Sequence, residues 1–407
     1  MASENIVAAL DIGTTKITVL VAEMDENDGI YVIGHGISNA EGMRRGVVVD
    51  MEKAVRSIGK AVEDAQMVSG TEIDAVTVSI AGEHIRSINS HGVIQVSHSD
   101  NEITASDVKR AIEAARTVAI PVDREIIHVI PQNFTVDAQS EIRDPIGMTG
   151  VRLELEAHIV TASISTAKNV YRAMERCNLE INHMVLEALA LSQVTLNDND
   201  MENGIIIVDI GGDLTNLSMF YEGAVRHTAV VTLGSRNVTN DIAIGLRTPL
   251  SKAEDLKIAH GSALINQVDP EEMIMVTSAD GRSSREISRN VLASIIEPRM
   301  EEILSLVLKE IRQANIKDML TGGMILTGGG ALLPGTVQLA ENIFDMPVRC
   351  GTINEIEHVP DEINDLRYFT ALGLLVYGFS NDPDGTGRRM KVKGMLKKFE
   401  NWISKQF

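Results

Sequence analysis

The fold of this chain is decided by Ile6-Val-Ala-Ala-Leu-Asp-Ile-Gly-Thr-Thr-Lys16, an apolar run that ends in Asp-Ile-Gly and a polar turn. Residues 17–22 are again apolar and β-branched, so the stretch predicts strand, tight turn, strand. The same pattern returns in Gly204-Ile-Ile-Ile-Val-Asp-Ile-Gly-Gly-Asp213, and a β-rich run over 214–221 follows it. The repeat predicts two duplicated domains that face each other, each with a carboxylate and a hairpin turn at a shared cleft.

A third element is Met324-Ile-Leu-Thr-Gly-Gly-Gly330, an apolar strand that enters three glycines and is followed by a helical stretch. Because glycine has no Cβ, such a loop lets the backbone approach a flat ligand closely. No G-x-x-x-x-G-K-[ST] occurs, and no G-x-G-x-x-G follows the first strand. A P-loop and a dinucleotide-binding fold are therefore not supported.

The composition fits a folded chain of two or three domains, since 407 residues include 44% apolar and 23% charged residues. A net charge of −20 disfavours a nucleic-acid partner. Two cysteines rule out a disulfide framework, and the histidines show no zinc-ligand spacing. The longest uncharged apolar run, residues 369–379, is shorter than a membrane span and predicts a buried helix. We therefore expect a cytoplasmic chain that does not cross a membrane.

The ordered set Asp-Ile-Gly-Thr-Thr, Asp-Ile-Gly-Gly and Thr-Gly-Gly-Gly resembles the actin/Hsp70/sugar-kinase superfamily. The resemblance implies an α/β, actin-like two-lobed fold with duplicated mixed-sheet domains around a cleft for ATP or ADP. Backbone N–H groups of the two turns can bind phosphates, and carboxylates can hold Mg²⁺ through water. The expected Mg²⁺ residues are Asp11 and Asp209. The expected nucleotide-binding residues are these two with Gly13, Thr14, Thr15, Lys16, Gly211, Gly212, Thr215, Gly328, Gly329 and Gly330.

Three further positions carry over from the superfamily, and one departs from it. Glu254 and Lys257 lie on one face of a helix that we expect Ser251 to cap, where the superfamily binds ribose and base; without the glycine loop they would fit a solvated helix face. Glu187 matches the segment that positions the attacking water. Asp213 stands where the superfamily has glycine, and its charge would repel the γ-phosphate unless it turns away or is screened. We therefore expect nucleotide binding with slow or absent hydrolysis.

Longer motifs narrow the resemblance: His128-Val-Ile-Pro-Gln132, Asp144-Pro-Ile-Gly-Met148, Gly150-Val-Arg152, Arg226-His-Thr228 and Glu297-Pro-Arg299. With them the chain resembles, over nearly its whole length, the FtsA family of bacterial cell-division actin homologues. The resemblance implies a β/α subdomain inserted into the first lobe. Predicted strands near 88–95, 126–134 and 151–160 and a helix over 105–118, capped by Thr104 with Asp107, fit that insert.

The expected division of the chain has six parts. The core of the first lobe takes residues 1–82, 164–190 and about 366–380, and the insert takes 83–163. The core of the second lobe takes 191–235 and 306–365, and a subdomain of that lobe takes 236–305. A turn-rich linker over 381–389 and an amphipathic helix over 390–407 complete the chain.

The C-terminal end differs in charge from the acidic body, since residues 388–407 hold seven Lys or Arg and one Glu, a local net charge of +6. On a helix the apolar residues here fall on an arc of about 140°, with every lysine outside it. Such a helix lies in a membrane interface, with lysines toward anionic headgroups. The alternative is a helix packed on the body or on a partner. The expected membrane-binding residues are Lys391, Val392, Met395, Leu396, Lys397, Lys398, Phe399, Trp402, Ile403, Lys405 and Phe407.

The family resemblance implies a peripheral adaptor at the cytoplasmic face of the inner membrane, at the division septum, that tethers the tubulin-like protein FtsZ. ATP and Mg²⁺ would close the lobes and favour head-to-tail filaments of the chain with itself, whose many terminal helices bind an anionic membrane together. The acidic FtsZ C-terminal tail needs a basic surface, and Arg285, Arg289 and Arg299 lie in the most basic stretch of the body; a solvated helix face is the alternative. Later membrane proteins of the divisome are expected at the insert.

Three other functions share a nucleotide cleft of this kind. A superfamily small-molecule kinase needs a catalytic base near a substrate pocket, and we find no catalytic motif beyond the phosphate turns. An Hsp70-like chaperone needs a peptide-binding domain, for which no room remains after residue 380. A pilus-assembly adaptor of similar fold stays open, and direct binding to FtsZ would separate it from a division adaptor.

Overall fold

A computed structural model describes residues 5–381, apart from 99, 280, 282 and 315–318. The expected membrane-binding helix lies outside the described residues, together with every side chain expected to bind the membrane. All but the first residue of the expected linker also lie outside them. Among the described helices, none is both long and apolar enough to cross a membrane.

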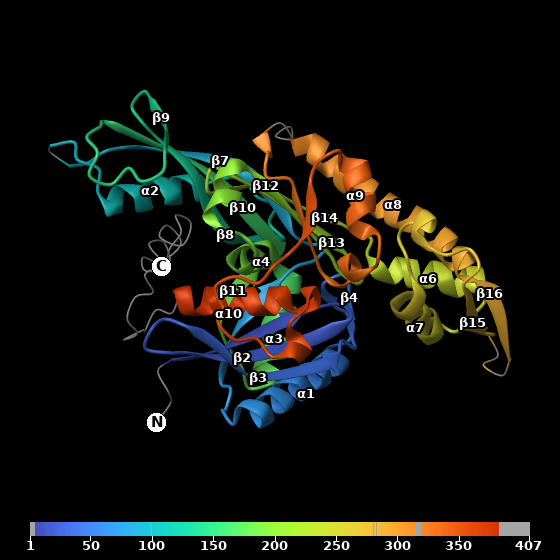
Figure 1. Cartoon of the computed structure of the whole chain (residues 1–407). Coiled ribbons are helices and arrows are strands. Elements are labelled where there is room, and N and C mark those ends of the chain that lie inside the picture. The colour runs from blue at the N-terminus through green and yellow to red at the C-terminus, as the bar shows by residue number, and fades with distance from the viewer. Residues whose placement is uncertain (1–4, 99, 280, 282, 315–318, 382–407) are drawn as a thin grey trace.

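Two five-stranded sheets of matching topology form the centre of the molecule (Figure 1). The first runs in the order β3-β2-β1-β6-β11, and the second in the order β14-β13-β12-β17-β18. In each, three antiparallel strands are continued by two parallel ones. The duplicated mixed sheets and the two-lobed α/β class predicted from the Asp-Ile-Gly repeat are thereby confirmed.

The first sheet consists of β1 (Ile6–Ile12), β2 (Lys16–Met24), β3 (Ile30–Asn39), β6 (Ala75–Ile80) and β11 (Glu180–Leu186). Its outer face is covered by α1 (Met51–Ser69) and α3 (Ile164–Arg176), through a buried cluster that includes Leu10, Val19 and Ile58. A small two-stranded turn, β4 (Met43–Arg44) with β5 (Val47–Val48), precedes α1.

The second sheet consists of β12 (Ile205–Ile210), β13 (Thr215–Tyr221), β14 (Ala224–Val231), β17 (Met324–Thr327) and β18 (Val348–Cys350). Every residue of β12 is buried, because helices cover both faces of the sheet, and this explains the unbroken apolar run before Asp209. This lobe core also contains α5 (Asp198–Asn203) and α9 (Thr336–Phe344), with short 3₁₀ turns at Gly329–Leu332 and Asp361–Ile363; a further 3₁₀ turn at Leu366–Tyr368 leads into the chain's return to the first lobe.

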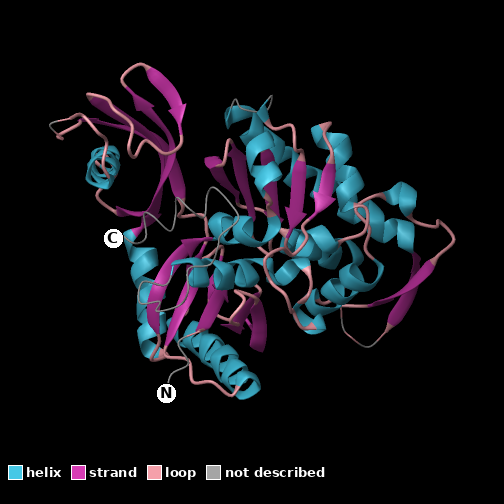
Figure 2. Ribbon diagram, turned by 60° about the vertical axis from the view of Figure 1, so that its left-hand side comes forward, coloured by secondary structure: helices cyan, strands magenta, loops and turns pink. Residues whose placement is uncertain are grey.

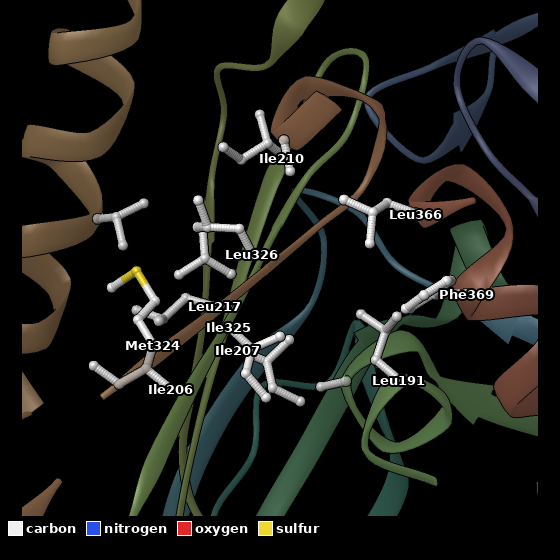
Figure 3. Close-up of a cluster of buried hydrophobic side chains, with 14 of the residues drawn as sticks. Leu191, Ile206, Ile207, Ile210, Leu217, Met324, Ile325, Leu326, Leu366 and Phe369 are labelled. Carbon is white, nitrogen blue, oxygen red and sulfur yellow. The ribbon is translucent and has the colours of Figure 1, made fainter. Parts of the chain in front are cut away.

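Two helices lie between the sheets and join the lobes. They are α4 (Glu187–Thr195), which packs on β11 and β13, and α10 (Phe369–Asn381), which packs on β1, β2 and α4. The buried helix predicted over 369–379 is therefore confirmed. Figure 3 shows Leu191 of α4 and Phe369 of α10 with Ile207 of β12 in this core.

The insert forms a separate sheet in the order β7-β10-β8-β9, which projects from the body in Figures 1 and 2. Its elements are β7 (Arg86–Gln95), α2 (Ala105–Arg116), β8 (Arg124–Val136), β9 (Gln139–Ile142) and β10 (Arg152–Ser163). The Thr104 hydroxyl accepts from the N–H of Asp107, whose carboxylate accepts in return, so the predicted capping box is confirmed.

The far end of the second lobe is mostly helical (Figure 1). It contains α6 (Ser235–Leu246), α7 (Leu250–His260), a 3₁₀ turn at Ile265–Gln267, the two-stranded ribbon of β15 (Met273–Thr277) and β16 (Ser284–Ser288), and α8 (Arg289–Ala314). The helix α8 runs back from this end to cover β13 and β14.

We predict that Gly373→Ala destabilises the protein by about 1–3 kcal/mol. A Cβ on Gly373 would lie 1.9 Å from the carbonyl oxygen of Ala190, so α10 and α4 would have to separate. The matched control is Gly59→Ala in the middle of α1, where a Cβ meets no atom within 4 Å. This control should gain about 0.5–1 kcal/mol from helix propensity. Urea unfolding of both variants measures the difference, and equal stabilities would contradict the prediction.

Candidate functional site

A cavity of about 600 Å³ opens between the two sheets, where β1 and β12 end. It is lined by both hairpin turns, the start of α4, one face of α7 and the glycine loop. Of the predicted nucleotide, metal and water-positioning residues, those that line it are Asp11, Gly13, Thr14, Thr15, Lys16, Glu187, Asp209, Gly211, Gly212, Glu254, Lys257, Gly328, Gly329 and Gly330. Residues that are far apart in sequence thus form one surface.

Thr215 does not contribute to this surface. Its side chain is fully buried, and its hydroxyl donates to the carbonyl oxygen of Leu233 at 2.9 Å. The residue begins β13 and faces the core, because side chains alternate along the strand. The next residue, Asn216, lines the cavity instead.

Two carboxyl groups, one near the end of β1 and one near the end of β12, lie at the floor of the cavity. Burial raises the pKa of Asp11, against the opposing effects of Lys16 and of Ser79, whose hydroxyl donates to Asp11 Oδ1 at 2.8 Å. Burial likewise raises the pKa of Asp209, which accepts from the Thr327 hydroxyl at 3.0 Å. Both groups therefore hold a proton more readily than an exposed aspartate.

Glu187, the first residue of α4, is a third buried carboxyl group in the cavity. Burial and then the charge of Asp209 raise its pKa well above the ordinary value. Its Oε2 accepts from Asn216 Nδ2 at 2.9 Å. A protonated Glu187 beside an ionised Asp209 is the arrangement this pair favours, because two adjacent carboxylates repel in a dry site.

Hard carboxylate oxygens at the floor of the cavity suit Mg²⁺. Within the part of the chain that the structure describes, no three acidic, His or Cys side chains come together closely enough to ligate one metal ion. Asp11 and Asp209 therefore fit an ion that is held partly by water and phosphate oxygens, as the sequence predicts, rather than a cage made only of protein ligands.

Lys16 follows the first turn and reaches into the cavity. Its Nζ lies 3.6 Å from the ring centroid of Tyr368 and donates to the carbonyl oxygen of Arg367. Burial lowers the pKa of Lys16 to about 8, against the opposing charge of Asp11. The ammonium group is thus tied to the segment that leads into α10, and it adds positive charge opposite the carboxylates.

Two of the three glycines of the loop are required by close contact with the neighbouring strand β12. A Cβ on Gly330 would lie 2.2 Å from Ile210 Cγ2, and one on Gly328, whose φ is +80°, would lie 2.6 Å from the Ile210 carbonyl oxygen. Gly329 has no such neighbour within 3.4 Å. The loop therefore packs tightly on β12 while it also presents its backbone to the cavity.

Glu254 and Lys257 meet on one face of α7, with Lys257 Nζ 2.8 Å from Glu254 Oε2. Lys257 also donates to the Thr239 hydroxyl at 2.9 Å and is buried, which lowers its pKa against the effect of Glu254. The predicted cap was wrong: α7 begins at Leu250, directly after Pro249, so Ser251 already lies in the first turn.

Asp213 points away from the cavity, which is one of the two arrangements that its charge allows. Its carboxylate lies 3.0 Å from Arg236 Nη1 and accepts from the N–H of Arg45 at 3.1 Å. The electrostatic reason to expect slow hydrolysis is therefore absent from this geometry, and the rate itself stays a prediction.

The three arginines predicted to bind a partner lie on β16 and α8. Arg289 pairs with Glu272 at 2.7 Å, and Arg299 pairs with Asp241 at 2.5 Å. Arg285 donates to the carbonyl oxygen of Leu246 at 2.8 Å. Acidic side chains of the same chain thus already engage two of the three.

Sequence reasoning missed several lining residues, among them Asn216, Ser235, Arg367 and Thr370. Asn216 could have been found, since the hairpin register places it opposite Asp209. Arg367 and Thr370 belong to no recognisable motif. They reach the cavity only because the segment that leads into α10 returns to the cleft.

Known proteins are similar to this chain in sequence. A sequence profile described as "Cell division protein FtsA" matches residues 206–373, and one described as "SHS2 domain inserted in FTSA" matches residues 82–161. The cell division protein FtsA of Pseudomonas aeruginosa is 39% identical over 100% of this chain and 99% of its own length. The chain belongs to the FtsA family.

Solved structures confirm the actin-like fold of this FtsA family member. A PilM–PilN type IV pilus biogenesis complex gives a TM-score of 0.67 at 13% identity, over 93% of this chain and 99% of the other. MreB5 of Spiroplasma citri bound to ADP gives a TM-score of 0.56 at 13% identity, over 92% of this chain and 97% of the other. At such identities the likeness concerns the fold alone.

We predict that binding of Mg²⁺ with ADP weakens as the pH falls into the acid range. The raised pKa values of Asp11, Asp209 and Glu187 mean that protons compete with the cation at a higher pH than they would at exposed carboxylates. Binding should also release protons.

Calorimetry in two buffers of different ionisation enthalpy measures this release. Asp209→Asn should reduce it, whereas Glu113→Gln, an exposed carboxylate on α2 that pairs with Arg116, should not. Equal proton release by both variants would contradict the prediction.

Proposed function

We propose that this FtsA family member is an ATP-binding, self-associating adaptor that tethers FtsZ to the cytoplasmic face of the inner membrane at the division septum. The observation that carries the proposal is the cavity, where both Asp-Ile-Gly turns, α7 and the glycine loop converge between duplicated sheets. The similarity to FtsA over the whole chain is the reason to place this cleft in a protein of cell division.

Nucleotide binding is supported by the charge pattern of the cavity. Carboxylates at its floor would face Mg²⁺, and the N–H groups of the two turns would face phosphate oxygens. Lys257 and Glu254 of α7 line the cavity together with the glycine loop, and a ribose and base would bind there. A relative in fold, MreB5 of Spiroplasma citri, has been solved with ADP.

Glu187 is the proposed water-positioning residue. Its carboxyl is buried beside Asp209, and Asn216 fixes one of its oxygens. When Mg²⁺–ATP is bound, the cation supplies Lewis-acid stabilisation of the phosphates, while Glu187 and Asn216 orient water and hold a proton at Glu187 Oε1 or Oε2. Slow or absent hydrolysis stays part of this proposal.

The proposed division of the chain keeps the boundaries expected from sequence, with the insert over 83–163. The match of the inserted SHS2 domain at residues 82–161 supports it. The insert projects as its own sheet beside the second lobe, which makes it available to further membrane proteins of the division machinery (Figure 2).

Membrane attachment through residues 390–407 is tested by flotation with anionic liposomes in the presence of ATP and Mg²⁺. We expect the full chain to float and a chain that ends at Asp384 to stay at the bottom, because the amphipathic end supplies both apolar and basic contacts. Neutral liposomes are the control, and with them flotation of the full chain should fall. If neither chain floats on anionic liposomes, the adaptor proposal fails, and a soluble kinase or chaperone becomes the favoured function.

FtsZ binding is tested at Arg285. We predict that Arg285→Glu weakens binding of the FtsZ C-terminal tail about tenfold, because reversal of a rim charge repels an acidic peptide. Arg285 is a sharper test than Arg289 or Arg299, whose reversal would also disrupt the pairs with Glu272 and Asp241. Arg56→Glu, an exposed arginine on α1 of the first lobe, is the control. Fluorescence anisotropy with the tail peptide measures both, and unchanged affinity for Arg285→Glu removes this surface from the proposal.

A further inference from the structure

The two hairpin turns of the cleft contact each other directly. The N–H of Asp213 donates to the Thr14 hydroxyl at 3.3 Å. A Cβ on Gly212 would lie 2.3 Å from Thr15 Cγ2, so the turns approach as closely as glycine permits. Since one turn belongs to each lobe, this contact sets how far apart the lobes stand at the cleft.

Two charged side chains of the second lobe reach across the same gap to the first lobe. Asp213, from the second lobe, accepts from the N–H of Arg45 in the first lobe at 3.1 Å. Its partner Arg236 donates from Nη2 to the carbonyl oxygen of Thr14 at 2.9 Å. Asp213 and Arg236 are themselves 3.0 Å apart, with side chains that are 10% and 38% exposed. Each member of the pair therefore binds the opposite lobe.

Both sides of the contact are held in place by local backbone structure. The helix α6 starts on the second turn, with Ser235 N–H and Arg236 N–H bonded to the carbonyl oxygens of Gly211 and Gly212 at 2.9 and 2.8 Å. On the first lobe, Arg45 sits in the tight turn between β4 and β5 with φ +48°. That turn presents the Arg45 N–H to Asp213, so the pair needs little reorganisation to form.

We propose that Asp213 and Arg236, with Thr14 and the backbone of Arg45, form an interlobe latch that sets the residence time of the nucleotide. This inference rests on the proposed nucleotide binding. Phosphates held between the two turns leave when the turns separate, and separation breaks these charge-assisted hydrogen bonds. Asp213 is thus a positioning residue that slows opening of the cleft. A glycine at this position would have no side chain with which to make these bonds.

The test measures dissociation of a fluorescent ADP derivative with Mg²⁺ in the full chain. We expect Asp213→Ala and Arg236→Ala each to speed release about tenfold, the factor that corresponds to loss of one charge-assisted bond. The double variant should be little faster than either single one, because the two residues act as one unit. Asp213→Asn and Arg236→Lys, which keep part of the bonding, should give intermediate rates.

The matched control is the Lys252–Asp255 pair, which also lies in the second lobe at 2.9 Å but joins two positions of the single helix α7. Lys252→Ala and Asp255→Ala should leave release unchanged. Hydrogen exchange of the nucleotide-free protein gives a second readout, in which amides of residues 12–15 and 211–214 exchange faster only in the latch variants. Circular dichroism shows whether each variant is folded. Because Asp213 and Arg236 are replaced separately, a folding defect in one variant still leaves the other as a test.

Unchanged release and unchanged exchange in folded Asp213→Ala and Arg236→Ala would overturn the latch, as would additive effects of the two changes. If the unaltered chain binds no nucleotide, the proposed function fails. The exchange of the two turns then still decides whether the latch holds the lobes together.

Discussion

The contact between α4 and α10 sets the spacing of the two sheets, and the site depends on that spacing. Gly373 allows the α10 backbone to meet the carbonyl oxygen of Ala190, so the two helices pack without an intervening side chain. The first residue of α4 is Glu187, which reaches the cavity, and the segment before α10 carries the Arg367 carbonyl that holds Lys16. A change in this one helix pair would therefore move both an acid and a base of the cleft.

The floor of the cavity brings together three buried carboxyl groups. Asp11, Asp209 and Glu187 are removed from bulk water, which raises the pKa of each, while Lys16 supplies one opposing ammonium group. In the proposed function, Mg²⁺ bound here with nucleotide phosphates would stabilise the ionised forms of these carboxyl groups.

The insert and the latch place contacts between the lobes on two further sides of the molecule. From the insert, Gln132 Nε2 donates to the carbonyl oxygen of Val225 on β14 at 2.7 Å, and His158 contacts the Thr228 hydroxyl at 3.0 Å. At the cleft, Asp213 and Arg236 bind across the gap. Opening of the lobes would therefore have to change these contacts of the insert as well as those of the hairpin turns.

The sequence by itself determined the two hairpins, their terminal aspartates, the glycine loop and the Thr104 cap, because each depends on short-range backbone preferences. The sequence around Asp11 and Asp209 also implied the duplication, since an apolar run, Asp-Ile-Gly and a polar turn before a second β-rich run predict the same strand–turn–strand unit twice. Only the tertiary structure decided that Thr215 faces the core while Asn216 faces the cavity, and that Asp213 turns to Arg236 and Arg45. Those outcomes depend on partners 18 to 168 residues away, and contacts over such distances leave no local pattern in the chain.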